Sequence, residues 1–198
     1  MRAFYKFCKE SAKITFSLLF GFEIINKERL LDSKSILIVA NHISWFDPPI
    51  LGSLIPFEIA FLAKAELFNN KFSCWLLENL NSIPLIRSAP DKKAISTVLD
   101  VLSAGKSLLL FPEGTRGGKR IKPGVGMFAI NTKKDILPIY LENSDDLKSC
   151  LFSSKKIKVI IGEKISYEHF SDWEPKKENY QKLADYSYQK IMELQTCK

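Results

Sequence analysis

The feature of this chain that most constrains its fold is a series of short apolar runs, such as ILIVA and SLLLF, without alternating polar residues. Runs of this kind form strands buried on both faces, as in a parallel sheet covered by helices. We expect strands over Ser35–Ala40, Glu58–Ala63, Ile83–Arg87, Ser107–Phe111, Ile136–Leu141 and Lys156–Gly162. Apolar spacing predicts helices over Pro48–Leu54, Phe68–Leu80, Lys92–Ala104, Gly124–Thr132 and Trp173–Lys198. This alternation predicts an α/β fold: a single domain with a mixed, largely parallel central sheet flanked by helices.

The N-terminal segment differs from the rest of the chain. Its cations are interleaved with aromatic residues, and its apolar stretch, Ile14–Phe22, is shorter than the roughly 20 residues of a membrane-spanning helix. Such a helix either packs against the core or lies in a membrane interface with its cations at the lipid headgroups. We expect the second arrangement, with residues 1–25 as an N-terminal amphipathic, membrane-interface helix and residues 26–198 as the α/β domain.

Composition and charge narrow the possible partners. The 198 residues suit one domain, and the formal net charge of +7 favours nucleic acid, an anionic membrane surface or a phosphorylated substrate. Nucleic acid binding would rest on charge alone, because the chain has no RNA-binding aromatic motif and no helix-turn-helix signature. The four cysteines form no CxxC pair, which argues against a disulfide framework or structural zinc and favours a reducing compartment.

A histidine and an aspartate follow the first predicted strand of the sheet. His42 comes directly after it, and Asp47 lies five residues later, before a proline pair. Ligands of open α/β sheets bind beyond the carboxyl ends of strands, where His42 is expected. Because proline suits the first turn of a helix, Asp47 is expected to be an N-cap. A hydrogen bond to Asp47 would orient the imidazole as a general base; the alternative is a helix cap beside a polar loop histidine.

A glycine-rich loop, PEGTRGG, follows the strand predicted at Ser107–Phe111. Its glycines allow backbone N–H groups to approach a ligand, Thr115 adds a hydroxyl, and the guanidinium of Arg116 suits a phosphate. Lys64 and Arg87 stand at the ends of two other predicted strands, so we expect these groups to meet at one edge of the sheet. The spacing is not that of a P-loop, and the alternative is a charged surface turn.

The order and spacing of these motifs resemble those of the glycerolipid acyltransferases. NHISWFD is similar to the NHxxxxD motif of that family, FPEGTR to its third motif, KAEL and IPLIR to its second, and ILPIY to its fourth. The resemblance covers Ser35–Tyr140 and is greatest to the short bacterial 1-acylglycerol-3-phosphate acyltransferases. It implies that residues 26–198 are an acyltransferase domain. The segment IKPGVGMFAI departs from the FKxGA-like pattern of the family through a proline and an extra glycine.

The resemblance implies transfer of a fatty acyl group from an acyl thioester to the sn-2 hydroxyl of 1-acylglycerol 3-phosphate, making phosphatidic acid in phospholipid biosynthesis. It implies that His42 is the general base and Asp47 its orienting partner. Substrate-binding roles are implied for Lys64, Arg87, Glu113, Gly114, Thr115 and Arg116. Backbone amides in the His42 and Gly114 loops are candidate oxyanion donors.

The resemblance also implies partners and a location. The acyl donor is acyl-CoA or acyl-ACP, so acyl carrier protein is one possible partner, and neither a cofactor nor a metal is expected. The acceptor is a lysophospholipid in an anionic membrane surface, which places the enzyme peripherally on the cytoplasmic face of the cell membrane. Two alternatives stay open: glycerol 3-phosphate or another lysophospholipid as acceptor, and, in a different class, a non-catalytic module that binds anionic lipids.

Overall fold

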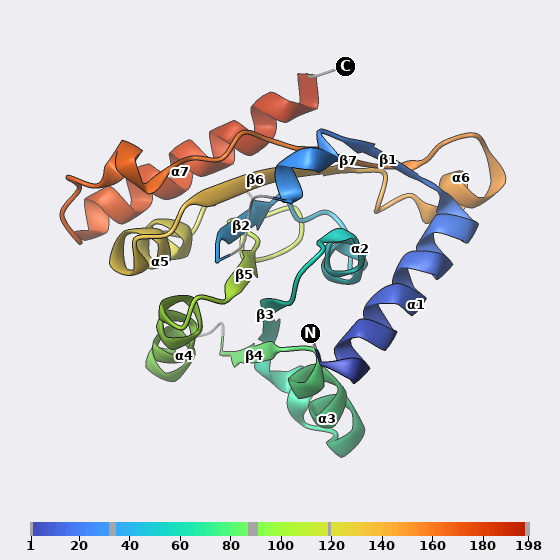
Figure 1. Ribbon diagram of the computed structural model, residues 1–198, viewed down its shortest axis with the longest axis horizontal. Coiled ribbons are helices and arrows are strands. Elements are labelled where there is room, and N and C mark those ends of the chain that lie inside the picture. Colours follow the sequence, from blue (N-terminus) through green and yellow to red (C-terminus); the bar gives the residue numbers. More distant parts are fainter. Residues whose placement is uncertain (1, 32–34, 87–90, 119, 197–198) are drawn as a thin grey trace.

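The computed structural model of the protein describes residues 2–31, 35–86, 91–118 and 120–196. A seven-stranded sheet with the order β1-β7-β6-β2-β5-β3-β4 forms its centre (Figure 1). The strands are β1 (Phe22–Ile25), β2 (Leu37–Ala40), β3 (Ile59–Lys64), β4 (Ser82–Leu85), β5 (Ser107–Leu110), β6 (Ile136–Glu142) and β7 (Ile157–Ile161). β6 and β7 pair antiparallel, and the other neighbouring strands pair parallel. The expected mixed, largely parallel sheet is confirmed.

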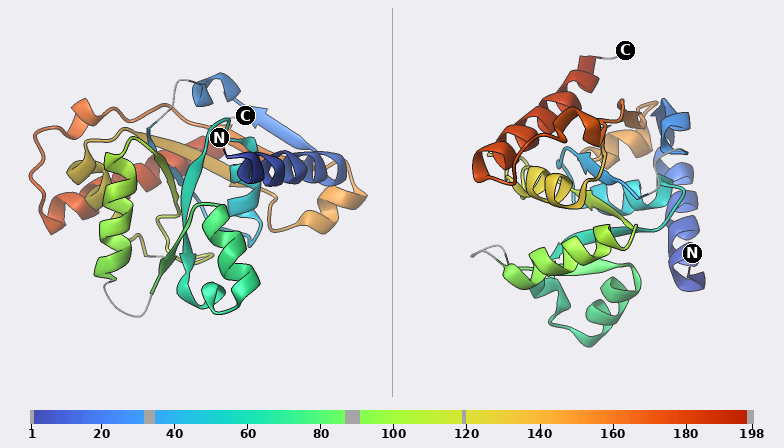
Figure 2. Two further views of the ribbon diagram at one scale, coloured as in Figure 1. Left: turned by 60° about the horizontal axis from the view of Figure 1, so that its bottom comes forward. Right: turned by 60° about the vertical axis from the view of Figure 1, so that its left-hand side comes forward.

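Helices cover both faces of this sheet. They are α1 (Ala3–Phe20), α2 (Asp47–Leu54), α3 (Lys71–Asn79), α4 (Lys92–Ser103), α5 (Gly124–Thr132), α6 (Leu147–Phe152) and α7 (Lys177–Glu193). Short 3-10 helices lie at Lys27–Leu30, Ala65–Phe68, Tyr167–Phe170 and Leu194–Thr196. α4, α5 and α7 lie together on one side of the sheet and α1 lies on the other (Figures 1 and 2). None of the helices in the described part of the chain is long and apolar enough to cross a membrane.

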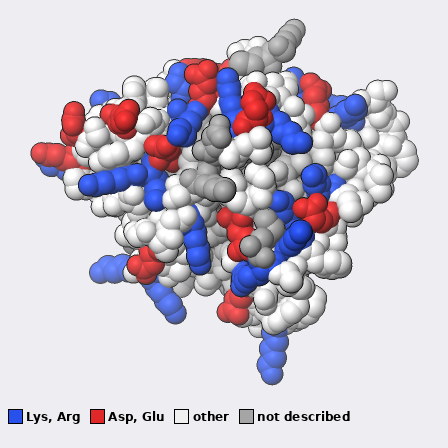
Figure 3. Space-filling model, in the orientation of Figure 1, with Lys and Arg blue, Asp and Glu red and all other residues white. Residues whose placement is uncertain are grey.

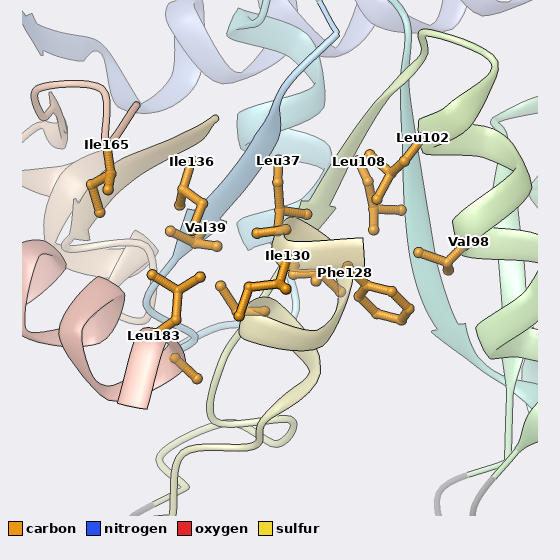
Figure 4. Packing of buried hydrophobic residues seen from close by; sticks show 14 of the residues in the cluster. Leu37, Val39, Val98, Leu102, Leu108, Phe128, Ile130, Ile136, Ile165 and Leu183 are labelled. Atoms are coloured by element: carbon orange, nitrogen blue, oxygen red, sulfur yellow. The ribbon is translucent and has the colours of Figure 1, made fainter. Parts of the chain in front are cut away.

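Two apolar clusters fill the space between the sheet and its helices. On β2, Leu37 and Val39 belong to the cluster under α4, α5 and α7 (Figure 4). Ile38 and Ala40 belong to the cluster under α1, α2 and α6. All four side chains are 0% exposed, because successive side chains point to opposite faces of the strand and both faces are covered. This double burial explains the unbroken apolar run in the sequence.

The N-terminal part of the fold differs from the sequence-based expectation. α1 ends at Phe20, because Gly21 takes a left-handed φ of 62° and donates its N–H to the carbonyl of Ser17. Residues 22–25 then form β1, which pairs with β7 at the edge of the sheet and so lies within the segment expected to be a separate helix. A strand of four residues directly after an apolar helix is too short to show an alternation of apolar and polar residues that would distinguish it from the helix.

Candidate active site

The candidate site lies at one edge of the sheet. β2, β5, β3 and β4 are neighbours and run parallel, so their carboxyl ends meet at this edge. His42 follows β2, Glu113 follows β5, and Lys64 is the last residue of β3. The structure therefore places these three groups on the side where ligands of open α/β sheets bind.

The side chains of His42 and Asp47 form a buried pair. Nδ1 of His42 lies 2.7 Å from Oδ2 of Asp47, and the two residues are 7% and 0% exposed. Because an ionised carboxylate only accepts hydrogen bonds, we assign the donated proton to Nδ1. The lone pair of Nε2 is then available to accept a proton, which is the arrangement that a general base requires.

The sequence-based prediction that Asp47 is the N-cap of α2 is wrong. Asp47 is the first residue of the helix, and its Oδ2 turns back to accept the backbone N–H groups of Ile43 and Ser44, each at 2.8 Å. Pro48 and Pro49 have no N–H, so donors that a capping carboxylate would take are missing. The carboxylate instead folds the loop around the imidazole.

Glu113 is the second buried carboxylate of the site. It is 5% exposed, and its Oε1 accepts the backbone N–H of His42 at 3.1 Å. Its buried Oε2 has no hydrogen-bond partner among the described residues. Burial raises the pKa of Glu113, against the lowering effect of hydrogen bonds from backbone N–H groups. Burial, followed by the nearby charge of Glu113, also raises the pKa of Tyr188 on α7.

The glycine loop closes against the histidine loop. Gly117 has a left-handed φ of 62° and donates its N–H to the carbonyl of His42 at 3.0 Å. The guanidinium carbon of Arg116 lies 3.3 Å from the ring centre of Trp45, which is a cation–π contact. Since Trp45 lies between His42 and Asp47 in the sequence, this contact holds an exposed guanidinium beside the buried pair.

Two of the expected cations lie farther from the pair or outside the described structure. Lys64 is about half exposed and its ammonium lies 3.1 Å from Glu66. In the sheet, its strand is separated from β2 by β5. Arg87 lies outside the described residues, because the description of this segment ends at Ile86.

Several backbone amides near the site already have acceptors within the protein. Four residues of the two loops donate their N–H groups in this way: His42, Ile43, Ser44 and Gly114. These four amides are therefore not free to be the oxyanion donors that the sequence suggests.

Comparison with known proteins shows the family of the chain. A family model described as Acyltransferase matches residues 21–142, which is more than half of the 198 residues. The chain belongs to the Acyltransferase family. The matched segment includes His42, Asp47 and Glu113, and membership of this family makes the chain an acyltransferase enzyme.

Individual relatives extend the match over most of the acyltransferase. The 1-acyl-sn-glycerol-3-phosphate acyltransferase of Bacillus subtilis is 32% identical over 194 residues, which are 96% of each chain. A lyso-ornithine lipid O-acyltransferase of Pseudomonas aeruginosa is 42% identical over 83 residues, which are 41% of this chain and 31% of that protein. The 1-acyl-sn-glycerophosphate (LPA) acyltransferase PlsC of Thermotoga maritima shares the fold, with a TM-score of 0.71 and 24% identity over 97% of this chain and 80% of the other.

Three residues that support the pair in this acyltransferase are missing from the sequence-based site. Oγ of Ser144 donates to Oδ1 of Asp47 at 2.6 Å. The Phe111 ring stacks on the imidazole of His42 with 4.2 Å between centroids. The amide of Asn41 exchanges two hydrogen bonds with the backbone of β6. The sequence could have identified Asn41 as a site residue, because it is the first residue of the NHxxxxD motif. Nothing in the sequence marks Ser144.

Proposed function

We propose that this acyltransferase moves a fatty acyl group from an acyl thioester to the sn-2 hydroxyl of 1-acylglycerol 3-phosphate, making phosphatidic acid in phospholipid biosynthesis. The observation that carries the chemistry is the 2.7 Å contact between His42 and Asp47 at the carboxyl edge of the sheet, which presents Nε2 as a base. The proposed acceptor follows the name of the Bacillus subtilis relative, which aligns with 96% of this chain.

In the proposed reaction, the proton of the acceptor hydroxyl moves to Nε2 of His42 while the hydroxyl oxygen attacks the thioester carbonyl carbon. The tetrahedral intermediate collapses, the C–S bond breaks, and the imidazolium returns its proton to the departing sulfur. The products are a new ester and a free thiol, without an acyl-enzyme. Asp47 keeps the imidazole oriented and stabilises its positive charge. A thioester is already activated, so the proposed reaction needs no cofactor and no metal.

The polar groups around the pair suit the acceptor. Arg116 and Thr115 are exposed at the glycine loop beside His42 and would bind the acceptor phosphate. Gly114 would contribute through the shape of the loop, because its φ is 69° and its N–H donates to the carbonyl of Phe111. Lys64, the last residue of β3, would add positive charge along the sheet edge, and we assign Arg87 a phosphate-binding role from the sequence alone. Glu113, whose Oε1 accepts the backbone N–H of His42, would help to position the glycerol.

Release of free thiol tests the proposed function. The purified protein is mixed in detergent with palmitoyl-coenzyme A or palmitoyl-acyl carrier protein, and with either lysophosphatidic acid or lysophosphatidylcholine. We expect release that depends on lysophosphatidic acid and is at least about tenfold faster than with lysophosphatidylcholine, because a lost hydrogen bond to a charged group costs about 1.5–3 kcal/mol. The choice of thioester that supports release identifies the donor.

Two further acceptors make this assay decisive. The Pseudomonas aeruginosa relative favours lyso-ornithine lipid as a second candidate acceptor, and glycerol 3-phosphate is the third. Release with one of these, and none with lysophosphatidic acid, would move the acceptor assignment to that compound. An absence of release with every acceptor and both donors would contradict the proposed function.

We also propose that α1 lies in the interface of the cytoplasmic membrane leaflet and holds the enzyme there. α1 packs on the fold through Tyr5 and Phe16, and on another face it leaves Phe7, Ile14 and Leu18 exposed at 69%, 58% and 81%. Positions separated by seven and four residues share one face of a helix, so the three side chains form an apolar stripe. Large apolar side chains of this kind lower their free energy by entering the acyl boundary.

The surroundings of α1 support a lipid contact. On α3, Phe72 and Trp75 are also exposed, and the Trp75 ring lies 5.0 Å from that of Phe4 on α1, between centroids. Aromatic residues of this kind are enriched at membrane interfaces. Figure 3 shows Lys and Arg interspersed with Asp and Glu on the face in view, so on that face the charge surplus forms no separate basic patch. The apolar stripe therefore carries this proposal more than the net charge does.

A matched pair of charge substitutions tests this contact. Leu18→Asp places a carboxylate on the apolar stripe, whereas Ser17→Asp places the same charge on a different face of the same turn. Burial of a leucine side chain contributes about 1.5–3 kcal/mol, so we expect Leu18→Asp to weaken binding to phosphatidylglycerol vesicles about tenfold or more in co-sedimentation. Ser17→Asp should bind nearly as wild type. Equal binding by both variants would place the membrane contact elsewhere.

A further inference from the structure

The carboxylate of Asp47 has one hydrogen-bond donor from a distant part of the chain. Oγ of Ser144 lies 2.6 Å from Oδ1 of Asp47, and both residues are 0% exposed. The other oxygen, Oδ2, accepts hydrogen bonds from the imidazole and from two backbone N–H groups. We infer that Ser144 is a positioning residue that fixes the plane of this carboxylate and, through it, the imidazole of His42. Its effect on turnover rests on the proposed function.

The neighbours of Ser144 hold it in place. It lies in the turn between β6 and α6, and β6 pairs with β2, the strand that leads to His42. Beyond the end of β2, the amide of Asn41 continues this pairing: Nδ2 donates to the carbonyl of Leu141 at 2.9 Å, and Oδ1 accepts its N–H at 2.7 Å. Asn143 takes a left-handed φ of 67° and donates its Nδ2 to the carbonyl that precedes β7 at 2.8 Å. The hydroxyl is therefore fixed relative to the strand that carries His42.

The chemistry of a buried carboxylate gives this hydroxyl its effect. The side-chain torsion that rotates an aspartate carboxylate has broad minima, so its hydrogen bonds determine its plane. The donors to Oδ2 come from the loop of residues 42–44, whereas Ser144 reaches Oδ1 from the β6–α6 turn. Without the hydroxyl, Oδ1 is a buried acceptor that has lost this donor, which is unfavourable. The carboxylate then tilts toward another donor and holds the Nδ1 proton less well.

Kinetics of two serine variants test the inference. Ser144→Ala removes the hydroxyl that donates to Asp47. Ser53→Ala removes a hydroxyl of α2 that is also buried and that donates to the carbonyl of Ile50 at 2.7 Å. We expect Ser144→Ala to lower kcat about tenfold or more with unchanged KM for both substrates. The basis is an analogy: substitution of the residues that orient metal-bound histidines through hydrogen bonds lowers activity by about 10–100-fold. Ser53→Ala should keep the wild-type kcat.

A spectroscopic measurement gives a readout that does not depend on turnover. The chain has two histidines, His42 and His169, so ¹⁵N-histidine labelling yields two sets of ring signals. In the wild type we expect the Nδ1-protonated tautomer at His42, and in Ser144→Ala a mixture of tautomers, with the His169 signals unchanged. A wild-type His42 spectrum, or a kcat equal to that of Ser53→Ala, would overturn the inference.

A replacement variant and the independence of the tautomer from turnover allow the role of Ser144 to be tested in every case. If Ser144→Ala does not fold, Ser144→Cys replaces the hydroxyl with a weak donor of similar size and carries the same expectations. If the wild type turns over none of the acceptors, the proposed function fails, and the tautomer of His42 still decides whether Ser144 positions Asp47.

Discussion

We expect the proposed acyl transfer to fall about 1,000-fold in kcat/KM in His42→Ala, while the protein stays folded. The proton acceptor at the carboxyl edge of β2 is then missing, and general-base catalysis contributes about 10²–10⁴-fold. The fold persists because His42 lies in a loop and Asp47 keeps its donors from Ile43, Ser44 and Ser144. Loss of one hydrogen bond to a charged group costs about 1.5–3 kcal/mol, so we expect the Tm to fall by about 3–12 °C.

The second histidine provides the matched control. His169 is exposed, stacks on Tyr186 with 5.3 Å between ring centroids, and lies outside the residues matched by the family model. His169→Ala should therefore keep wild-type thiol release in the same assay. If His42→Ala retained more than about a tenth of the wild-type rate, His42 would not be the general base. A fall in rate of less than tenfold is smaller than the contribution of general-base catalysis, which is about 10²–10⁴-fold.

The sequence predicts the features of the site that depend on residues close together in the chain and on the parallel pairing of the strands. His42 and Asp47 are five residues apart in one strand-to-helix loop, so any compact path of that loop brings the two side chains near each other. The convergence of β2, β3 and β5 follows from their parallel pairing, which the double-sided apolar runs predict. Neither feature depends on side-chain contacts between distant segments.

The features that the sequence does not predict depend on contacts between distant residues, or on which of several nearby N–H groups a side chain accepts. Ser144 and Asp47 are 97 residues apart in the sequence, and a serine after a strand belongs to no pattern that would identify it as a site residue. Asp47 fits the composition of a helix cap, but the two prolines after it remove N–H donors and its carboxylate turns back toward the loop. β1 is a four-residue strand whose pairing with β7 exists only in the folded sheet.

The extra glycine that separates this chain from the FKxGA-like pattern has a packing reason. A Cβ added at Gly126 of α5 would lie 2.0 Å from the backbone oxygen of Tyr180 on α7, so the two helices touch at a position that admits only glycine. Gly124, two residues earlier on the same helix, would meet nothing closer than 3.8 Å, at a ring carbon of Phe128. α7 lies beyond residues 21–142, so this contact joins the family-matched part of the chain to a helix outside it.

Gly126→Ala is therefore the substitution from which we expect a large loss of stability. Backbone atoms of Tyr180 cannot rotate away, so α7 must shift, and overpacking of this kind costs about 3 kcal/mol or more, or about 6–12 °C in Tm. Gly124→Ala adds the same methyl group without a clash and should change stability by less than about 1 kcal/mol, in the stabilising direction. Thermal unfolding followed by circular dichroism compares the two variants. Equal Tm values would mean that α7 is not packed against α5 as described, and the placement of Tyr188 beside Glu113 would then lose its support, because α7 carries that tyrosine.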